Sequence, residues 1–396
     1  MRSNYKQLGS YIRQVDERNI NLAITNLQGV SITKEFVPSI ANIIGTDLSV
    51  YKIVRKGQFA YGPVTSRNGD KVSIALRKGD DCIISSSYTP FEVYKPDELL
   101  PEYLMLWFMR PEFDRYARFM SNGSAREVFD WDCMCGVELP VPPIGEQRKI
   151  VHDYKVVTDR IDLLKEITLN LEEQASIYFE DKYGRFIPDG FTVSEDIPAG
   201  WTISVVGNYC KSNMHSYSGE FDTLLYLDTG SITNNYICDL QVLNPNEDEI
   251  PSRARRKVSN GDIVYSTVRP NLRHYGIIYD PPSNMIVSTG FSVMTMLKTS
   301  HLSNEFIYMW LTRDSVVNVL QSIAENSVST YPSIVSSDLE QIKIVVPTEK
   351  ESVESNGFLK TVFRTIDYNN KEIRSLELYL NDLVAILLNN SITEGA

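Results

Sequence analysis

The feature that most constrains the fold is an internal repeat, in which four short stretches recur in the same order about 204 residues further along the chain. The matched stretches are "SIT" (31–33 and 231–233), "KGQFAY" and "NGDIVY" (56–61 and 260–265), "PEYLMLWFMR" and "NEFIYMWLTR" (101–110 and 304–313), and "VELPVPP" and "IKIVVPT" (137–143 and 342–348). Self-similarity at a nearly constant spacing indicates duplication of a structural unit. The 396-residue chain is therefore predicted to hold two related domains.

A long helix is predicted after the proline-containing joint that ends each copy. Apolar residues recur there in alternating steps of four and three, a seam that packs helix against helix. Thr348, with Glu351 three residues later, forms a capping box for the second helix, whereas the first helix must use Gly145 or solvent. Polar Thr168, Ser355 and Asn369 on the seam would fix its register. The residues predicted to pair the helices are Ile150, Tyr154, Val157, Ile161, Leu164, Leu171, Leu359, Val362, Ile366, Ile373, Leu376, Leu380 and Leu383.

Connectivity makes the two helices antiparallel if they share this seam, because the first leads into domain two and the second begins where domain two ends. We predict an α+β protein with two mixed α/β domains in tandem repeat, joined by two long antiparallel coiled-coil helices with pseudo-two-fold symmetry. Such a helix would be roughly 54 Å long at about 1.5 Å per residue. The predicted boundaries are 1–145 for domain one, 146–186 for the central helix, 187–347 for domain two and 348–396 for the C-terminal helix.

The charge of the chain is unevenly distributed. The net charge of −12 argues against a protein that coats nucleic acid indiscriminately. Residues 52–80 nevertheless contain seven Lys or Arg against two Asp, and residues 253–275 contain six against one. Each segment alone is equally consistent with a solvated loop, but their recurrence at matching positions in both copies favours two binding surfaces.

The two basic segments contain the candidate contacts to DNA. "YGPVTSRNGDK" (61–71) and "YSTVRPNLRHYG" (265–276) each start at the matched Tyr, and "NGSAREV" (122–128) and "ENSVSTY" (325–331) form a second pair. Arg can donate to guanine and Asn can pair with adenine at base edges, while Lys and backbone amides hold phosphates. The alternative for each Arg is a surface salt bridge. The predicted DNA-binding residues are Tyr61, Ser66, Arg67, Asn68, Lys71, Ser124, Arg126, Arg255, Arg256, Thr267, Arg269, Asn271, Arg273 and His274.

Sequence signals for catalysis or metal binding are weak. "DPPS" (280–283) has Ser283 where an amino-methyltransferase motif needs an aromatic ring, so a turn is the better interpretation. The sequence contains no GxxxxGK[ST] phosphate-binding motif, its four His are scattered, and its five Cys form no framework. We expect a non-catalytic protein without a bound metal. Apolar runs such as "LVAILL" (383–388) are too short to cross a bilayer, so a cytoplasmic protein is expected.

Three stretches carry a resemblance to a known family. They are "LPVPPIGEQRKIV" (139–151), "IPAGW" (197–201) and "STVRPNLR" (266–273). Over nearly its whole length the chain resembles the specificity (S) subunit of a type I restriction-modification system. The second joint, "VVPTEKESV", departs from the pattern because it lacks the Glu-Gln pair.

The resemblance implies a recognition subunit that is not itself catalytic. It would bind double-stranded DNA and two modification (M) subunits, which bring S-adenosylmethionine and methylate adenine, while restriction (R) subunits that use ATP can join the complex. No cofactor would bind this chain directly. Each domain would read one half of a split DNA site, and the site would be asymmetric because the two domains differ in sequence.

Two alternatives remain open at the level of sequence. One is the recognition subunit of a related system whose methyltransferase and nuclease partners are organised differently. The other is a bivalent scaffold whose two domains bind proteins. A scaffold would bind DNA with an affinity that is indifferent to base sequence, and it would leave the paired Arg and Asn segments without a role.

Overall fold

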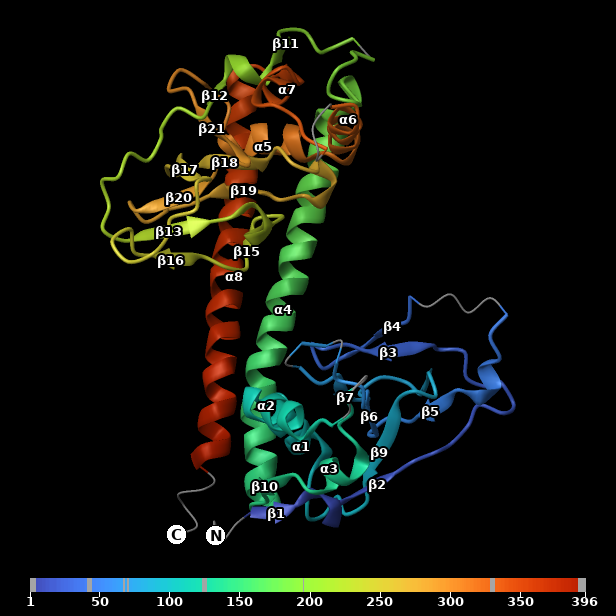
Figure 1. The fold of residues 1–396 in the computed structure, drawn as a ribbon. Helices are drawn as coiled ribbons and strands as arrows, with labels where there is room; N and C mark the ends of the chain where they lie inside the picture. Colours follow the sequence, from blue (N-terminus) through green and yellow to red (C-terminus); the bar gives the residue numbers. More distant parts are fainter. Residues whose placement is uncertain are drawn as a thin grey trace. The chain divides into compact units, whose positions relative to one another are not determined.

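The computed structural model describes residues 5–40, 45–66, 68–69, 71–122, 127–194, 196–327 and 332–390, with side chains to residue 384 except 381. The chain forms two compact units, which are residues 1–159 with 377–396 (unit 1) and residues 160–376 (unit 2). Two long helices, α4 (Ile144–Lys182) and α8 (Glu349–Asn390), contribute to both units (Figure 1).

Unit 1 combines short strands with three helices. Its strands form a four-stranded sheet in the order β2-β9-β6-β7 and the antiparallel pairs β1-β10, β3-β4 and β5-β8. The strands are β1 (Tyr5–Gln7), β2 (Ile12–Gln14), β3 (Gln28–Val30), β4 (Phe36–Pro38), β5 (Lys52–Val54), β6 (Phe59–Tyr61), β7 (Ile74–Leu76), β8 (Cys82–Ile84), β9 (Thr89–Val93) and β10 (Glu138–Pro140). The helices are α1 (Pro101–Phe108), α2 (Pro111–Met120) and α3 (Trp131–Cys135).

Unit 2 repeats this plan with a second four-stranded sheet. The sheets have the orders β12-β21-β18-β19 and β16-β13-β20-β17, beside the pairs β11-β22 and β14-β15. The strands are β11 (Thr202–Val205), β12 (Cys210–Ser212), β13 (Leu224–Leu227), β14 (Ile232–Thr233), β15 (Tyr236–Ile237), β16 (Gln241–Leu243), β17 (Ala254–Lys257), β18 (Asp262–Ser266), β19 (Tyr275–Ile278), β20 (Met285–Ser288), β21 (Phe291–Met296) and β22 (Lys343–Val346). The helices are α5 (Asn304–Thr312), α6 (Asp314–Glu325) and α7 (Ser336–Glu340).

The predicted tandem repeat is confirmed by the order of the elements. In both units a first strand pairs with the last one, β1 with β10 and β11 with β22. The sheet β2-β9-β6-β7 corresponds to β12-β21-β18-β19, and three helices follow each sheet in the chain. The chain enters each repeated domain through the first strand of this pair and leaves it through the second. The pair therefore marks both ends of the domain.

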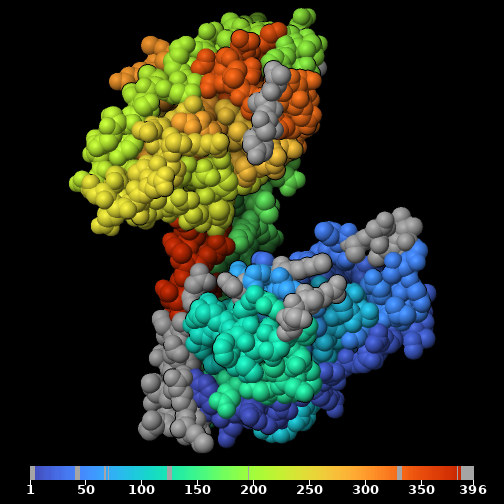
Figure 2. All heavy atoms as spheres, viewed as in Figure 1, coloured from blue at the N-terminus to red at the C-terminus, as the bar shows by residue number. Residues whose placement is uncertain are grey.

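Each unit has its own apolar core around the matched tryptophan. Trp107 is 8% exposed and Trp310 is fully buried, as expected for the apolar face of an amphipathic helix. In unit 1, Phe59 stacks on Phe91 with ring centroids 4.9 Å apart. Figure 2 shows the yellow and orange atoms of unit 2 as one closely packed body.

The two long helices pair in antiparallel fashion, as predicted. In unit 2, the Asn369 side-chain amide donates to the Thr168 hydroxyl at 3.2 Å, and the Ser355 hydroxyl bonds the Tyr183 hydroxyl at 2.6 Å. Later residues of α4 therefore meet earlier residues of α8. In unit 1, Ile150 and Val384 belong to one core. The thirteen residues predicted to pair the helices are all buried or half-buried.

The helix starts are fixed by side chains. At α8, the Thr348 hydroxyl accepts from the Glu351 amide at 3.4 Å, and Glu351 accepts from the Thr348 amide at 3.3 Å, which is the predicted capping box. At α4, the fully buried Gln147 accepts from the Leu100 amide at 2.9 Å and donates to the Glu98 carbonyl at 2.8 Å.

Unit 2 makes the same connection from a position one helical turn later. Asn356 of α8 accepts from the Ser303 amide at 3.1 Å and donates to the His301 carbonyl at 2.8 Å. Ser303 and His301 match Leu100 and Glu98 in the repeat. An amide side chain thus ties each long helix to the start of α1 or α5, although the sequence around the second joint lacks the Glu-Gln pair.

Candidate nucleic-acid interface

Two segments that are distant in sequence meet in unit 1. The backbone after β6 runs beside the backbone that precedes α3, with a β-bridge between Val64 and Val128. The Thr65 amide donates to the Glu127 carbonyl at 3.0 Å, and the Phe129 amide donates to the Pro63 carbonyl at 2.8 Å. The described ends of the predicted segments 61–71 and 122–128 therefore lie side by side at residues 63–65 and 127–129.

Unit 2 repeats these backbone contacts at matching positions. Val268 forms the bridge with Ser333, the Arg269 amide donates to the Pro332 carbonyl at 3.0 Å, and the Ile334 amide donates to the Thr267 carbonyl at 2.9 Å. We call the described residues of the two joined segments of each unit its loop pair: 62–66, 68–69 and 71 with 121–122 and 127–129 in unit 1, and 266–274 with 326–327 and 332–334 in unit 2. The duplication has preserved the loop pair although the side chains differ.

The loop of unit 2 that follows β18 has an unusual backbone. A short 3₁₀ turn (Pro270–Leu272) is flanked by Arg269 at φ 49° and Arg273 at φ 56°. Both arginines lie in the left-handed region, which costs a non-glycine residue roughly 1–2 kcal/mol. Gly69, which matches Arg273 in the repeat, has φ 60°. A left-handed residue at this position is thus common to both units, and unit 2 places an arginine there instead of glycine.

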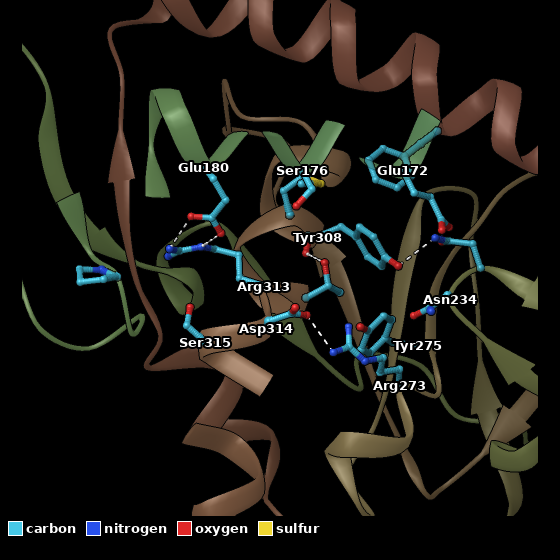
Figure 3. Close-up of a pocket in the computed structure, with 15 residues that line it drawn as sticks. Glu172, Ser176, Glu180, Asn234, Arg273, Tyr275, Tyr308, Arg313, Asp314 and Ser315 are labelled. Carbon is cyan, nitrogen blue, oxygen red and sulfur yellow. Dashed lines mark hydrogen bonds and ion pairs between the residues drawn. The ribbon is translucent and has the colours of Figure 1, made fainter. Parts of the chain in front are cut away.

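The side chains of this loop divide into exposed and engaged groups. Arg269, Asn271 and Leu272 are exposed. Arg273 donates from Nη2 to Asp314 Oδ1 at 2.8 Å, and Figure 3 shows the two side chains pointing toward one another (Figure 3). Arg269 and Asn271 are therefore accessible to solvent, and the guanidinium of Arg273 is bound to Asp314.

His274 and Thr267 contribute polar atoms at the base of the loop. His274 Nδ1 lies 2.7 Å from the Ile232 carbonyl, which can only accept, so Nδ1 carries the proton. In the neutral imidazole Nε2 is then an acceptor. The Thr267 hydroxyl donates to the Gly290 carbonyl at 2.9 Å, so it retains only acceptor capacity.

Arg255 and Arg256, on β17, differ in their surroundings. Arg255 is exposed and donates to the Ser252 carbonyl at 3.3 Å. Arg256 is half-buried, burial lowers its pKa, and its buried Nη1 has no hydrogen-bond partner in the described part of the chain. Only Arg255 is therefore open to a ligand on its exposed side.

Arg253 is a candidate that the sequence prediction missed. Its side chain is exposed, and its carbonyl accepts from the Thr289 amide at 2.8 Å. The neighbouring Gly290 carbonyl accepts from the Thr267 amide, also at 2.8 Å, which links β17 to the loop pair. The basic composition of 253–275 included Arg253, but only the fold places it next to this loop.

The residues of unit 1 that were predicted to contact DNA differ in their exposure. Tyr61 is 1% exposed and its ring packs near Phe91 and Phe129, so the expectation that it contacts DNA is corrected by its place in the core. Ser66 and Lys71 are exposed, and the side-chain amide of Asn68 donates to the Val64 carbonyl at 3.4 Å. Three predicted residues lie outside the described residues: Arg67, Ser124 and Arg126.

Two of the seven basic residues in 52–80 are paired with carboxylates. Arg55 pairs with Glu17 and, at 2.8 Å, with Asp81, and Lys52 lies 3.9 Å from Asp16. The predicted basic surface of this segment is therefore smaller than its composition suggested. Asp16 and Glu17 are more than 30 residues away in sequence, and Asp81 lies just beyond the segment, so a charge count over 52–80 included none of the three.

A cavity of about 540 Å³ lies beside the loop pair in unit 2. Helix α4 contributes Glu172, Ser176 and Glu180 to its wall (Figure 3). Burial raises the pKa of Glu172 to about 7. Arg313, which is nearly buried, donates to Glu180 at 2.6 Å and to the Ile187 carbonyl at 2.6 Å. Arg313, which the repeat matches with Arg110, therefore has a structural role in unit 2.

Unit 1 has a larger groove at the corresponding place, with a volume of about 1060 Å³. Arg110, which matches Arg313, contributes to its wall and lies over the Trp107 ring at 4.6 Å. In the same groove, Lys34 forms a nearly buried ion pair with Asp114 at 2.7 Å. The two hollows occupy matching positions but have different linings.

The fold and the site define a class: an α+β protein with two related units, each of which presents a loop pair with polar and basic side chains. Residues 213–378 match the family described as "Type I restriction modification DNA specificity domain". A specificity subunit of the type I restriction enzyme HindI from Haemophilus influenzae is 22% identical over 157 residues, which are 40% of this chain and 34% of that protein.

Further relatives carry the same description. The MjaIX specificity subunit from Methanocaldococcus jannaschii is 20% identical over 296 residues, which are 71% of this chain and 66% of that protein. The crystal structure of a type I restriction-modification system S subunit from M. genitalium has a TM-score of 0.61 and 13% identity, and the match covers 97% of this chain and 95% of that one. That likeness is one of fold.

Residues 213–378 match this family model, and the chain is similar to the specificity subunits of type I restriction-modification systems, the family that its sequence motifs resemble. The match spans about a third of the length of the Haemophilus influenzae relative and about two thirds of the Methanocaldococcus jannaschii one. Within the described part of the chain, no helix combines the length and apolar character that a membrane-crossing segment needs.

Proposed function

We propose that the chain is the sequence-specific DNA-recognition subunit of a type I restriction-modification complex. Each unit reads one half of an asymmetric, bipartite site in double-stranded DNA, and the helices that join the units set the gap between the halves. The observation that carries this proposal is the loop pair, which both units build with the same backbone contacts and fill with different side chains. A conserved frame with variable side chains suits two readers of different base sequences.

The chemistry of the exposed side chains supports this role. Arg269 and Asn271 are exposed on the unit 2 loop, and these residue types can donate to guanine or pair with adenine at base edges. Ser66 and Lys71 are exposed on the unit 1 loop, where Lys can hold a phosphate. Recognition by a few such contacts does not require a basic chain, because partner subunits can supply much of the phosphate-binding surface.

The partners in this proposal are two M subunits, with R subunits able to join them. S-adenosylmethionine would be bound by the M subunits and not by this chain. In unit 2 the paired helices offer apolar side chains to a partner, because several of them are exposed. They are Leu163, Ile167, Leu169, Ile177, Val353 and Tyr368.

The proposal is tested by expressing the tagged chain in its host, identifying co-purified proteins by mass spectrometry, and sequencing the host genome with detection of methylated bases. A strain that lacks the gene is the control. We expect an M subunit among the co-purified proteins, and methyladenine at one bipartite motif that disappears in the deletion strain. Partners without a methyltransferase, together with an unchanged methylation pattern, would favour the protein-binding scaffold instead.

A further inference from the structure

The recognition loop of unit 2 rests on one helix, α6. Asp314, in its first turn, accepts the hydrogen bond from Arg273 Nη2 at 2.8 Å. Gln321, two turns later, accepts from the Asn271 backbone amide through Oε1 at 3.2 Å. The two side chains therefore hold the loop at two points, one through a side chain and one through the backbone.

The backbone of this loop needs such support. Arg269 and Arg273 are both left-handed and flank the short turn, so the free energy of the loop would fall if either residue relaxed to a common conformation. The ion pair with Asp314 opposes relaxation at Arg273. The bond to Gln321 fixes the amide of Asn271, whose side chain is exposed.

We propose that Asp314 and Gln321 are positioning residues for recognition of one half-site, and that Arg273 is an anchor of the loop and not a base-reading residue. This inference rests on the proposed function. Asp314 and Gln321 hold the loop so that Arg269 and Asn271 meet the DNA in a single arrangement. Well-defined placement matters because a base-edge contact depends on the direction of its hydrogen bonds.

Unit 1 does not contain the same support. At the positions that match Asp314, Gln321 and Arg273 it has Pro111, Arg118 and Gly69. Proline has no side chain that can accept a hydrogen bond, and Gly69 adopts its left-handed conformation without strain. Substitutions in α6 are therefore expected to affect one half-site and to leave the other unchanged, which gives each experiment an internal control.

The first test is a selection from a randomised library of DNA duplexes with the full-length chain and its co-purifying subunits. Asp314→Asn and Gln321→Ala are compared with wild type and with Asn318→Ala, an exposed position on the same helix. We expect each of the two loop-supporting variants to lose about tenfold in preference at one half-site, a size typical of one mismatched base pair. The other half-site, the Asn318→Ala profile and the thermal midpoints should stay as in wild type.

The second test separates an anchor from a reader. Arg273→Asp alone should relax the same half-site, and the double variant Arg273→Asp with Asp314→Arg should restore the wild-type profile because it restores the ion pair. If Arg273 reads a base, the double variant will stay relaxed and the anchor role is refuted.

The outcomes also distinguish this inference from the function on which it rests. A wild-type selection without any enriched motif would overturn the proposed function. A wild-type motif that Asp314→Asn and Gln321→Ala leave intact, or weaken equally in both halves, would overturn the positioning role alone.

Discussion

Some matching residues of the two copies have the same role, and others have different roles. Tyr61 and Tyr265 are both buried, so this matched position belongs to the apolar core in both units. Arg313 bonds Glu180 and backbone carbonyls, whereas Nε of the matching Arg110 lies 3.3 Å from Glu112 Oε2. Each of the two arginines lies over the matched tryptophan of its unit. Identity between the copies therefore marks positions of the frame, and under the proposed function recognition would depend on the positions where the copies differ.

Arg269→Ala is expected to relax recognition of one half-site only. The exposed guanidinium would be lost, while the backbone contact of residue 269 with Pro332 would remain. A lost bidentate contact to a base typically costs about 1–3 kcal/mol of discrimination. Titrations with duplexes altered in either half measure the effect. Equal loss of affinity for every DNA sequence would instead assign Arg269 to the phosphate backbone.

At the scale of elements, each domain is tied to a long helix by one amide side chain. Gln147 is fully buried and bonds the Leu100 amide and the carbonyls of Glu98 and Pro142. Asn356 makes the corresponding bonds in unit 2 from one turn further along its helix. These hydrogen bonds go to backbone groups of the domain, so they do not depend on which side chains the domain carries.

Gln147→Ala is expected to lower the free energy of unfolding of the chain by about 2–4 kcal/mol, because it leaves buried backbone groups without partners. Thermal or urea unfolding of the full chain measures this loss. Gln174→Ala provides the control, since Gln174 is exposed and bonds only Asn170 among the described residues. Equal stability of the two variants would contradict the role given to Gln147.

Glu172 makes the stability of the helix-and-sheet packing in unit 2 depend on pH. Because burial raises its pKa in the folded state to about 7, folding takes up a proton, and stability increases as pH falls from 8 toward about 4.5. Glu172→Gln removes the charged state and should stabilise the protein at pH 8 by at most about 3 kcal/mol. The gain should vanish near pH 4.5.

Unfolding curves at several pH values test this dependence. Glu173→Gln, at the exposed neighbouring position, should show no comparable pH-dependent gain. A constant difference between Glu172→Gln and wild type from pH 4.5 to 8 would show that the carboxyl of Glu172 is not the titrating group.

The sequence predicted the elements well because their signals are local or periodic. The repeat, the helical seam with Thr168 and Asn369, and the capping box at Thr348 all depend on spacing along the chain. It could not predict that residues 63–65 lie beside 127–129, because that contact depends on how the strands close the sheet. The burial of Tyr61 and the neutralisation of Arg55 by Glu17 escaped the sequence analysis for the same reason.

At the scale of the whole molecule, duplication gives one frame two different sets of exposed side chains, as the proposed function requires. Each unit closes on itself through a strand pair, with Tyr5 opposite Pro140 in unit 1 and Thr202 opposite Val346 in unit 2. Both domains present matching backbone groups to the amide of the long helix. A domain should therefore be exchangeable for its counterpart without redesign of this connection.

A hybrid chain in which residues 202–346 replace residues 5–140 is expected to recognise two copies of one half-site. The entering and leaving strands of the inserted domain bring their own pairing, and its backbone groups at His301 and Ser303 match those of Glu98 and Leu100 in the repeat. Selection from randomised duplexes, or the methylation pattern of a host that carries the hybrid, reads out the new site. A folded hybrid that still selected two different half-sites would mean that specificity does not reside in the repeated domains, whereas loss of one original half-site and duplication of the other would assign each half to its unit.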